Sequence, residues 1–276
     1  MLETALNSQP GETPPLSGAI SSSVFPEHNR LNSWREHFGE QFLRLQIDPL
    51  DDEPFRYDAS FTMMQGLHVS RGSVSAIRCT RTRDLIDDSN DDMVILIPQR
   101  GMMQVMEGGK EMNIGSGDAL VRRSSEVGQT LSTGGEYLTM SVPHSALAGQ
   151  VLDIDRLGFA IVPEGNTALG LLASYLNAIL ASNIRENGQG PDLAASILAA
   201  RHVHELTGLV LDSSRDNWYR LDTVGSGIQE ARMAAIRSEI ERHAGDPDFS
   251  INDVARRQGV SPGYIRKLLA ARGERF

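Results

Sequence analysis

The chain has 276 residues, of which 40% are hydrophobic, and a formal net charge of −10 at pH 7. This length allows two or three compact units, each with enough apolar side chains to form a core. The single cysteine, Cys79, excludes an internal disulfide and a cysteine-based zinc cluster, and it is typical of a reducing cytoplasm. No apolar run approaches the roughly eighteen residues of a membrane-spanning helix.

The N-terminal region is predicted to be a disordered leader followed by a helix. Residues 1–24 are polar and rich in Pro, Ser and Gly, and they lack the basic start and apolar run of a signal peptide. In residues 28–42, Leu31, Trp34 and Phe38 stand at helical spacing, which predicts one amphipathic helix.

From about Phe61 the apolar pattern changes to short runs separated by turn residues, which predicts strands. Gly108-Gly109 indicates a two-residue hairpin, and the sequence GSGD at residues 115–118 indicates a second turn. Strands at this density imply a compact antiparallel sandwich or small barrel whose interior can hold a small molecule. The predicted strands are residues 74–81, 93–99, 102–107, 110–114, 119–122 and 137–142.

After Pro163 the pattern becomes helical, and two apolar stripes predict two helices that serve as core or as a subunit interface. The polar residues 182–191 connect them, and residues 213–227 contain the turn formers of a linker. The stripes consist of Leu169, Leu172, Leu176, Ile179 and Leu180, and of Leu193, Ile197, Ala200 and Leu211.

A third helix, residues 228–244, is predicted to support the C-terminal segment with Ile228, Ala235, Ile236 and Ile240 on one side. Beyond it, residues 250–276 read as two short helices joined by a sharp turn. Ser250 is a good N-cap, and Asp253 stands where its carboxylate can reach back to the N–H of the cap.

The turn and the second helix complete a helix-turn-helix pattern. Gly259 stands where the first helix must reverse, Ser261 caps the second helix, and Pro262 occupies its first position. Ile265 and Leu268 are expected to point back toward Val254 and Ala255, on the first helix, whereas Arg266 and Lys267 point toward a ligand. The same spacing also fits an ordinary pair of packed helices.

Charge favours the DNA-binding interpretation. Residues 250–276 contain six Lys or Arg and two acidic residues, a net charge of +4, so the preceding residues sum to −14. A basic end on an acidic body is expected when only that end meets phosphate. Arg266 and Lys267 are the residues that this pattern points toward DNA.

Catalytic and metal-binding patterns are weak, so we predict no enzyme activity, cofactor or metal. His202 and His204 are two apart and point to different faces of a helix, unlike the pair in HExxH. Cys79 is expected to be a buried inert thiol, and His68 and His144 to be surface or satisfied polar residues. The acidic pairs at residues 87–88 and 91–92 indicate a solvated loop rather than a cation site.

The C-terminal sequence IRSEIERHAGDPDFSINDVARRQGVSPGYIRKLLAARG resembles the first helix-turn-helix of the AraC/XylS family of bacterial transcription regulators. The upstream half is similar, more weakly, to the sensor domain of the XylS-like branch. The matching pieces are Trp34 with Phe38, the pair Arg81-Thr82, GMMQVMEGGKEMNIGSGDALV, and Val142-Pro143-His144 leading into Leu147.

This resemblance implies an α+β protein with an N-terminal cupin-like antiparallel β-domain at residues 25–150, which senses a ligand or dimerises. A helical region at 151–212 follows, and the partial DNA-binding domain occupies 228–276. The implied partners are promoter DNA, RNA polymerase, a small catabolic effector and a second copy of the chain. The implied function is transcription activation.

The sequence departs from the family because it stops at Phe276, where the long helix to a second helix-turn-helix should begin. The resemblance therefore predicts a chain truncated after the first motif. The alternative function is a ligand-binding or dimerisation protein that does not bind DNA independently. In the pose that the resemblance implies, the helix from Ser261 to Arg272 lies in the major groove, and Arg266 can bind a guanine in bidentate fashion. Gly263 falls at a contact position but has no side chain to read a base. The DNA-binding residues implied by this pose are Ser261, Pro262, Gly263, Arg266 and Lys267.

Overall fold

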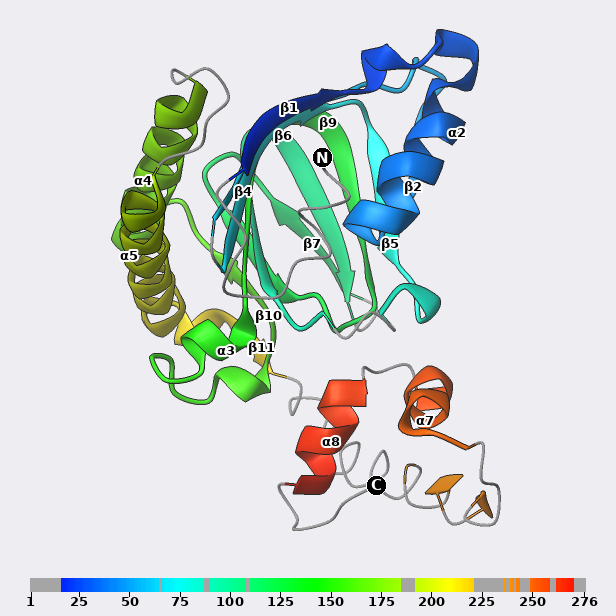
Figure 1. Ribbon diagram of the computed structural model, residues 1–276, viewed down its shortest axis with the longest axis vertical. Coiled ribbons are helices and arrows are strands. Elements are labelled where there is room, and N and C mark those ends of the chain that lie inside the picture. Colours follow the sequence, from blue (N-terminus) through cyan, green and yellow to red (C-terminus); the bar gives the residue numbers. More distant parts are fainter. Residues whose placement is uncertain are drawn as a thin grey trace.

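The predicted α+β architecture, an antiparallel β-domain with helices C-terminal to it, is confirmed (Figure 1). The computed structural model describes residues 16–64, 66–86, 90–107, 110–184, 192–220, 236, 239–240, 242–243, 249–258 and 262–270.

The β-domain is one sheet of eleven strands, in which neighbouring strands are antiparallel. Its main path runs β1-β3-β4-β9-β6-β8-β10-β11, while β5 joins β9 to β2 and β7 pairs with β6. The strands are β1 (Leu16–Ser21), β2 (Gln46–Pro49), β3 (Tyr57–Met64), β4 (Leu67–Val74), β5 (Ile77–Arg81), β6 (Met93–Glu107), β7 (Lys110–Ile114), β8 (Ala119–Arg123), β9 (Gly128–Val142), β10 (Leu157–Val162) and β11 (Trp218–Arg220).

The sheet is curved, with one concave and one convex side (Figure 1). The two longest strands, β6 and β9, pair along most of their length. Their register shifts between Pro98 and Arg100 and again between Gly101 and Met103. Gly101 has a φ of +90°, and a Cβ there would lie 2.1 Å from the carbonyl oxygen of Gly134, on β9. Glycine at this position therefore allows the two strands to approach where the ladder is irregular.

The convex side of the sheet is covered by helices α4 (Thr167–Ile184) and α5 (Leu193–Ser213), as Figure 1 shows. Alternation along β9 explains the packing: Leu138, Met140 and Val142 are buried in the largest apolar cluster, together with Leu172 and Leu176 of α4. Both helices were predicted from their stripes. Asp192 caps α5 by accepting a hydrogen bond from the backbone N–H of Ala195 at 2.9 Å.

The predicted helix at residues 28–42 is confirmed, although its geometry changes along its length. A 3-10 turn, η2 (Glu27–Asn29), leads into α2 (Arg30–Trp34), and the segment continues as the π-helix η3 (Arg35–Leu43). The Trp34 side chain is fully buried and stacks on Phe38 with ring centroids 4.5 Å apart. Trp34 packs with Ile47 and Ile77 of β2 and β5, which fixes the helix on the sheet.

Several predicted boundaries are wrong. Within the predicted leader, Leu16–Ser21 forms β1, because pairing with β3 satisfies the backbone groups of this Ser- and Gly-containing segment. The predicted linker includes β11, which pairs with β10, and its Trp218 is buried. Since β10 lies after residue 150, the β-domain extends beyond its predicted end. Residues 1–15, 65 and 221–235 lie outside the described residues.

The strand predictions also differ in their limits. The predicted strand 74–81 is two strands, β4 and β5, whereas the predicted strands 93–99 and 102–107 are the single strand β6. Glu107 pairs with Lys110, so the connection between β6 and β7 has the predicted two residues. The predicted turn at residues 115–118 is confirmed, because the N–H of Asp118 donates to the carbonyl of Gly115 at 3.3 Å. Among the described helices, none has both the length and the apolar character needed to cross a bilayer.

Candidate functional sites

The C-terminal helices form the first candidate site. Helix α7 (Ile251–Gln258) is followed by α8 (Pro262–Ala270). The predicted N-terminal cap is confirmed, because the Asp253 carboxylate accepts from both the N–H of Ser250, at 2.9 Å, and its hydroxyl, at 2.6 Å. Both bonds run from Ser250 to the Asp253 carboxylate, and they tie the first turn of α7 to the residue that precedes it.

The two helices share a small apolar core with the helix before them. Val254, Ala255 and Ile265 are buried in it, as predicted, and Leu269 supplies the next turn of α8. The side chain of Leu268, which we predicted for this core, lies outside the described residues. Ile236 is fully buried in the same cluster, which supports the predicted bracing role of its helix. The rest of that predicted helix is described only in part.

A ring contact joins the bracing helix to the start of α7. The imidazole of His243 stacks on the Phe249 ring, with centroids 4.4 Å apart and planes inclined by 13°. The His243 Nδ1 atom lies 2.9 Å from the carbonyl oxygen of Glu239. These contacts define how the chain enters the helix pair.

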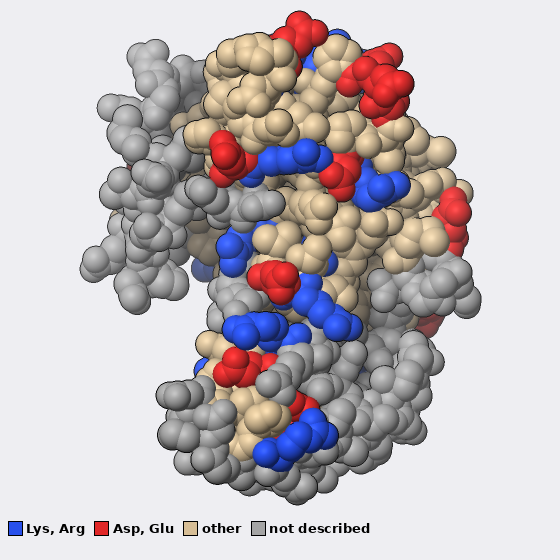
Figure 2. Space-filling model, turned by 90° about the vertical axis from the view of Figure 1, so that its right-hand side faces the viewer, with Lys and Arg blue, Asp and Glu red and all other residues tan. Residues whose placement is uncertain are grey.

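The predicted DNA-binding residues have different surroundings. Arg266 is exposed on α8, Gly263 is half-buried and Pro262 is buried. Lys267 lies on α8, but its side chain is outside the described residues, as are all of Ser261 and Gly259. Their contacts with DNA stay predictions. Figure 2 shows basic side chains from the upper part of one face of the molecule down to its lower end, interspersed with acidic ones.

The concave side of the sheet forms the second candidate site. Tyr137 faces away from the helix-covered side; its hydroxyl lies 2.6 Å from the Ser132 hydroxyl and donates to the carbonyl of Met102 at 3.2 Å. Arg122 lies on the same side, where its Nη1 donates to the Thr130 hydroxyl at 3.4 Å. Polar groups of this kind among apolar walls can orient a small ligand.

Burial favours the uncharged forms of His68, Cys79 and Tyr57 on this side. Burial lowers the pKa of His68 to about 4. Burial raises the pKa of Cys79 to about 12, opposed by the charge of Arg122 and assisted by that of Asp48. Burial, and next the neighbouring Cys79, raise the pKa of Tyr57 to about 12. The high pKa of Cys79 agrees with the predicted inert thiol.

The remaining sequence candidates are not brought together. His202 Nδ1 lies 3.1 Å from the Tyr175 hydroxyl, while His204 Nε2 lies 3.0 Å from the carbonyl oxygen of Gly66. Among the described residues, no three His, Cys, Asp or Glu side chains are grouped as metal ligands. The prediction of a solvated loop is wrong for Asp91, which is bound by Arg123. The other acidic pair, residues 87–88, lies outside the described residues.

Comparison with known proteins identifies a domain family for the larger part of the chain. Residues 34–212 match the model of a family described as AraC-binding-like domain. The crystal structure of the AraC-like transcriptional activator CuxR is similar, with a TM-score of 0.61 and 14% identity over 94% of this chain and 90% of that one. Apo ToxT K231A from Vibrio cholerae is matched with a TM-score of 0.42 and 9% identity, over 76% of this chain and 77% of that one. No curated protein sequence gave a match.

Proposed function

The chain belongs to the family of AraC-binding-like domains, and from this premise we propose that it is a sequence-specific DNA-binding transcription regulator that responds to a small molecule. The family match covers α4, nearly all of α5, and the β-domain without β1 and β11. The fold, which CuxR shares, extends over most of the chain. We assign effector binding to the concave side of the sheet and DNA binding to α8.

One observation carries the DNA-binding part of the proposal. Arg266 is exposed on α8, while Ile265, next to it, is fully buried against α7. The helix pair thus presents a guanidinium to solvent beside its anchored face, and a guanidinium can bind guanine in bidentate fashion in the major groove. The excess of basic residues in 250–276 supplies further attraction to phosphate.

Substituting Arg266→Ala is expected to weaken specific DNA binding by about 1–3 kcal/mol. The measurement is a fluorescence anisotropy titration with a labelled duplex from the promoter adjoining the gene, compared with a scrambled duplex. Arg78→Ala, at an exposed position on β5, is the matched control and should bind like the unmodified protein. Equal affinity of the Arg266→Ala protein for the promoter duplex would remove Arg266 from the interface.

The alternative is a ligand-binding or dimerisation protein without independent DNA binding. It is favoured by one observation, that the family match ends at residue 212 and leaves α7 and α8 outside. The same titration separates the two functions. A regulator gives affinity that falls steeply between about 50 and 200 mM salt, whereas the alternative gives no isotherm at either salt concentration.

We also propose that the protein forms a homodimer through α5. Leu193, Ile197 and Leu209 are 58%, 49% and 57% exposed along this helix, and Leu171 of α4 is 57% exposed. Leu193 and Ile197 stand four residues apart, on the same side of α5, and exposed apolar side chains placed in this way favour burial against a second copy. Ile197→Asp is therefore expected to shift the protein from dimer to monomer in analytical ultracentrifugation. Asn252→Asp, which adds the same charge on the exposed side of α7, should leave the mass unchanged.

The finer assignments rest on the resemblance of the sequence to the XylS-like branch. We infer that the protein acts in the cytoplasm as an activator, contacts RNA polymerase and performs no catalysis. Activation can be measured by in vitro transcription of the same promoter duplex with purified RNA polymerase, with and without the protein. An activator increases the transcript yield, and a decrease would assign repression instead.

A further inference from the structure

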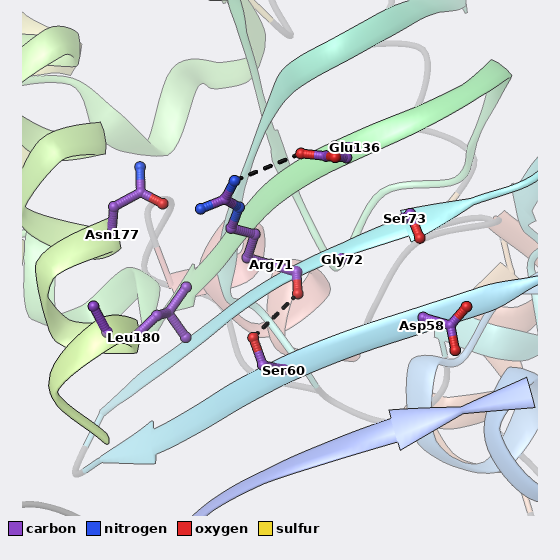
Figure 3. Close-up of a pocket in the computed structure, with 9 residues that line it drawn as sticks. Asp58, Ser60, Arg71, Gly72, Ser73, Glu136, Asn177 and Leu180 are labelled. Carbon is purple, nitrogen blue, oxygen red and sulfur yellow. Dashed lines mark hydrogen bonds and ion pairs between the residues drawn. The ribbon is translucent and has the colours of Figure 1, made fainter. Parts of the chain in front are cut away.

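A hollow lies on the helix-covered side of the sheet, between α4 and strands β3, β4 and β9 (Figure 3). Its volume is about 380 Å³, within the usual range for small-molecule sites. It is separate from the concave side, because Leu138, the cross-strand partner of Arg71, packs in the cluster that contains α4. The lining consists of Asp58, Ser60, Arg71, Gly72, Ser73, Glu136, Asn177, Leu180 and Ala181.

Strand register places the polar side chains in two rows. Asp58 pairs with Ser73, and Ser73 pairs with Glu136, so a hydroxyl stands between two carboxylates across three strands. Ser60 and Arg71 form the next row on the same side, two residues along each strand. Arg71 is on the middle strand, two residues from Ser73, and Figure 3 shows its guanidinium turned toward Glu136.

The two carboxylates are not equivalent. Glu136 has two cationic neighbours, because its Oε2 lies 3.5 Å from Arg71 Nη2 and its Oε1 lies 3.6 Å from Arg100 Nη1. Asp58 accepts a hydrogen bond from the Ser21 hydroxyl, and within the described part of the chain it has no ion pair. Asp58, which is exposed, is therefore the carboxylate of the hollow that has no ion pair with Lys or Arg among the described residues.

The α4 wall adds an acceptor and an apolar surface. The Oδ1 atom of Asn177 is shielded from solvent and finds no hydrogen-bond partner among the described residues, while its Nδ2 donates to the carbonyl of Ala173 at 3.0 Å. Carboxylates and amide oxygens only accept hydrogen bonds, so the hollow favours a ligand that brings donors. Leu180 and Ala181 offer carbon surface beside these polar groups.

We propose that this hollow binds a small organic amine. The ammonium group lies against the Asp58 carboxylate, with the Ser60 and Ser73 hydroxyls around it, and the carbon chain lies along Leu180 and Ala181. Charge complementarity with Asp58 selects a cation, and the Arg71 guanidinium disfavours one near Glu136. This site depends neither on DNA binding nor on an effector in the concave side.

The test is isothermal titration calorimetry of the full chain with 1,4-diaminobutane at low ionic strength. We expect saturable binding that weakens at least tenfold in Asp58→Asn, which keeps a side-chain oxygen for Ser21 but removes the charge. Ala181→Phe should weaken binding as strongly, because the added ring fills the hollow from the exposed side of α4. Glu111→Gln, an exposed carboxylate on β7, is the matched control and should retain the affinity of the unmodified protein.

Two further probes share the four-carbon chain: 1,4-butanediol is neutral and succinate is anionic. Neither should bind. The proposal is overturned if 1,4-diaminobutane gives no saturable heat, if either control probe binds as tightly, or if both Asp58→Asn and Ala181→Phe retain the original affinity. Far-UV circular dichroism checks that each variant is folded. If Asp58→Asn does not fold, the affinity of Ala181→Phe for 1,4-diaminobutane alone tests the proposal.

Discussion

Substituting Arg123→Leu is expected to lower the free energy of unfolding by about 3 kcal/mol, the lower end of the loss when one partner of a buried ion pair is removed. The Arg123 side chain is 2% exposed, and its Nη2 lies 2.8 and 2.9 Å from the two carboxylate oxygens of Asp91. Its Nη1 donates to the carbonyl of Asp155 at 3.2 Å. Without the guanidinium, the carboxylate of Asp91 loses its cation in a position where water replaces it only in part, since that side chain is 33% exposed.

Equilibrium denaturation with urea measures this loss. Arg100→Leu is the matched control, because Arg100 is 79% exposed and its 3.6 Å contact with Glu136 is worth at most about 1 kcal/mol. In the double variant Arg123→Leu with Asp91→Leu, the uncompensated charge is gone, so part of the stability should return. If Arg123→Leu and Arg100→Leu lower the free energy of unfolding equally, the ion pair between Arg123 and Asp91 does not stabilise the β-domain more than an exposed ion pair does.

The helices of the β-domain were predictable because their signal is local. The stripe from Leu169 to Leu180 repeats at helical spacing, and α4 buries Leu169, Leu172, Leu176, Ile179 and Leu180. The cap formed by Ser250 and Asp253 also depends on residues only three apart. Such features need no knowledge of the remaining chain.

The strands that we did not predict are of two kinds. Strand β3 has a local period-two signal, because apolar and polar residues alternate along it from Tyr57 to Met63. In contrast, β11 has three residues, too few for a pattern, and it forms only through pairing with β10. The same holds for β1, whose composition resembles that of a disordered segment.

In the candidate sites too, features set by neighbouring residues were predicted and features set by distant strands were not. The exposed position of Arg266 and the burial of Ile265 follow from helical spacing and the cap, and they were predicted. The hollow at Asp58 was not, because Asp58, Ser73 and Glu136 meet only through the register of three strands. No local motif encodes that alignment, nor the contact of Arg123 with Asp91.

Substituting Ile265→Ala is expected to abolish DNA binding altogether, through loss of the helix pair. Ile265 is fully buried in a core whose other buried members, among the described residues, are Ile236, Ile251, Val254, Ala255 and Leu269. Truncating a buried isoleucine costs about 2–5 kcal/mol, which is a large share of the stability of a short helical unit. The change therefore removes the platform on which Arg266 is presented, whereas Arg266→Ala removes only the contact.

Circular dichroism at 222 nm separates these two mechanisms. Ile265→Ala should reduce the helical signal and eliminate the salt-dependent anisotropy change, while the urea transition of the β-domain stays in place. Asn252→Ala, at an exposed position on α7, should alter neither the helical signal nor DNA binding. A fully helical Ile265→Ala protein that still binds the promoter duplex would show that contacts other than this core hold α8 against α7. In that case Arg266 would owe its position to the turn between the helices.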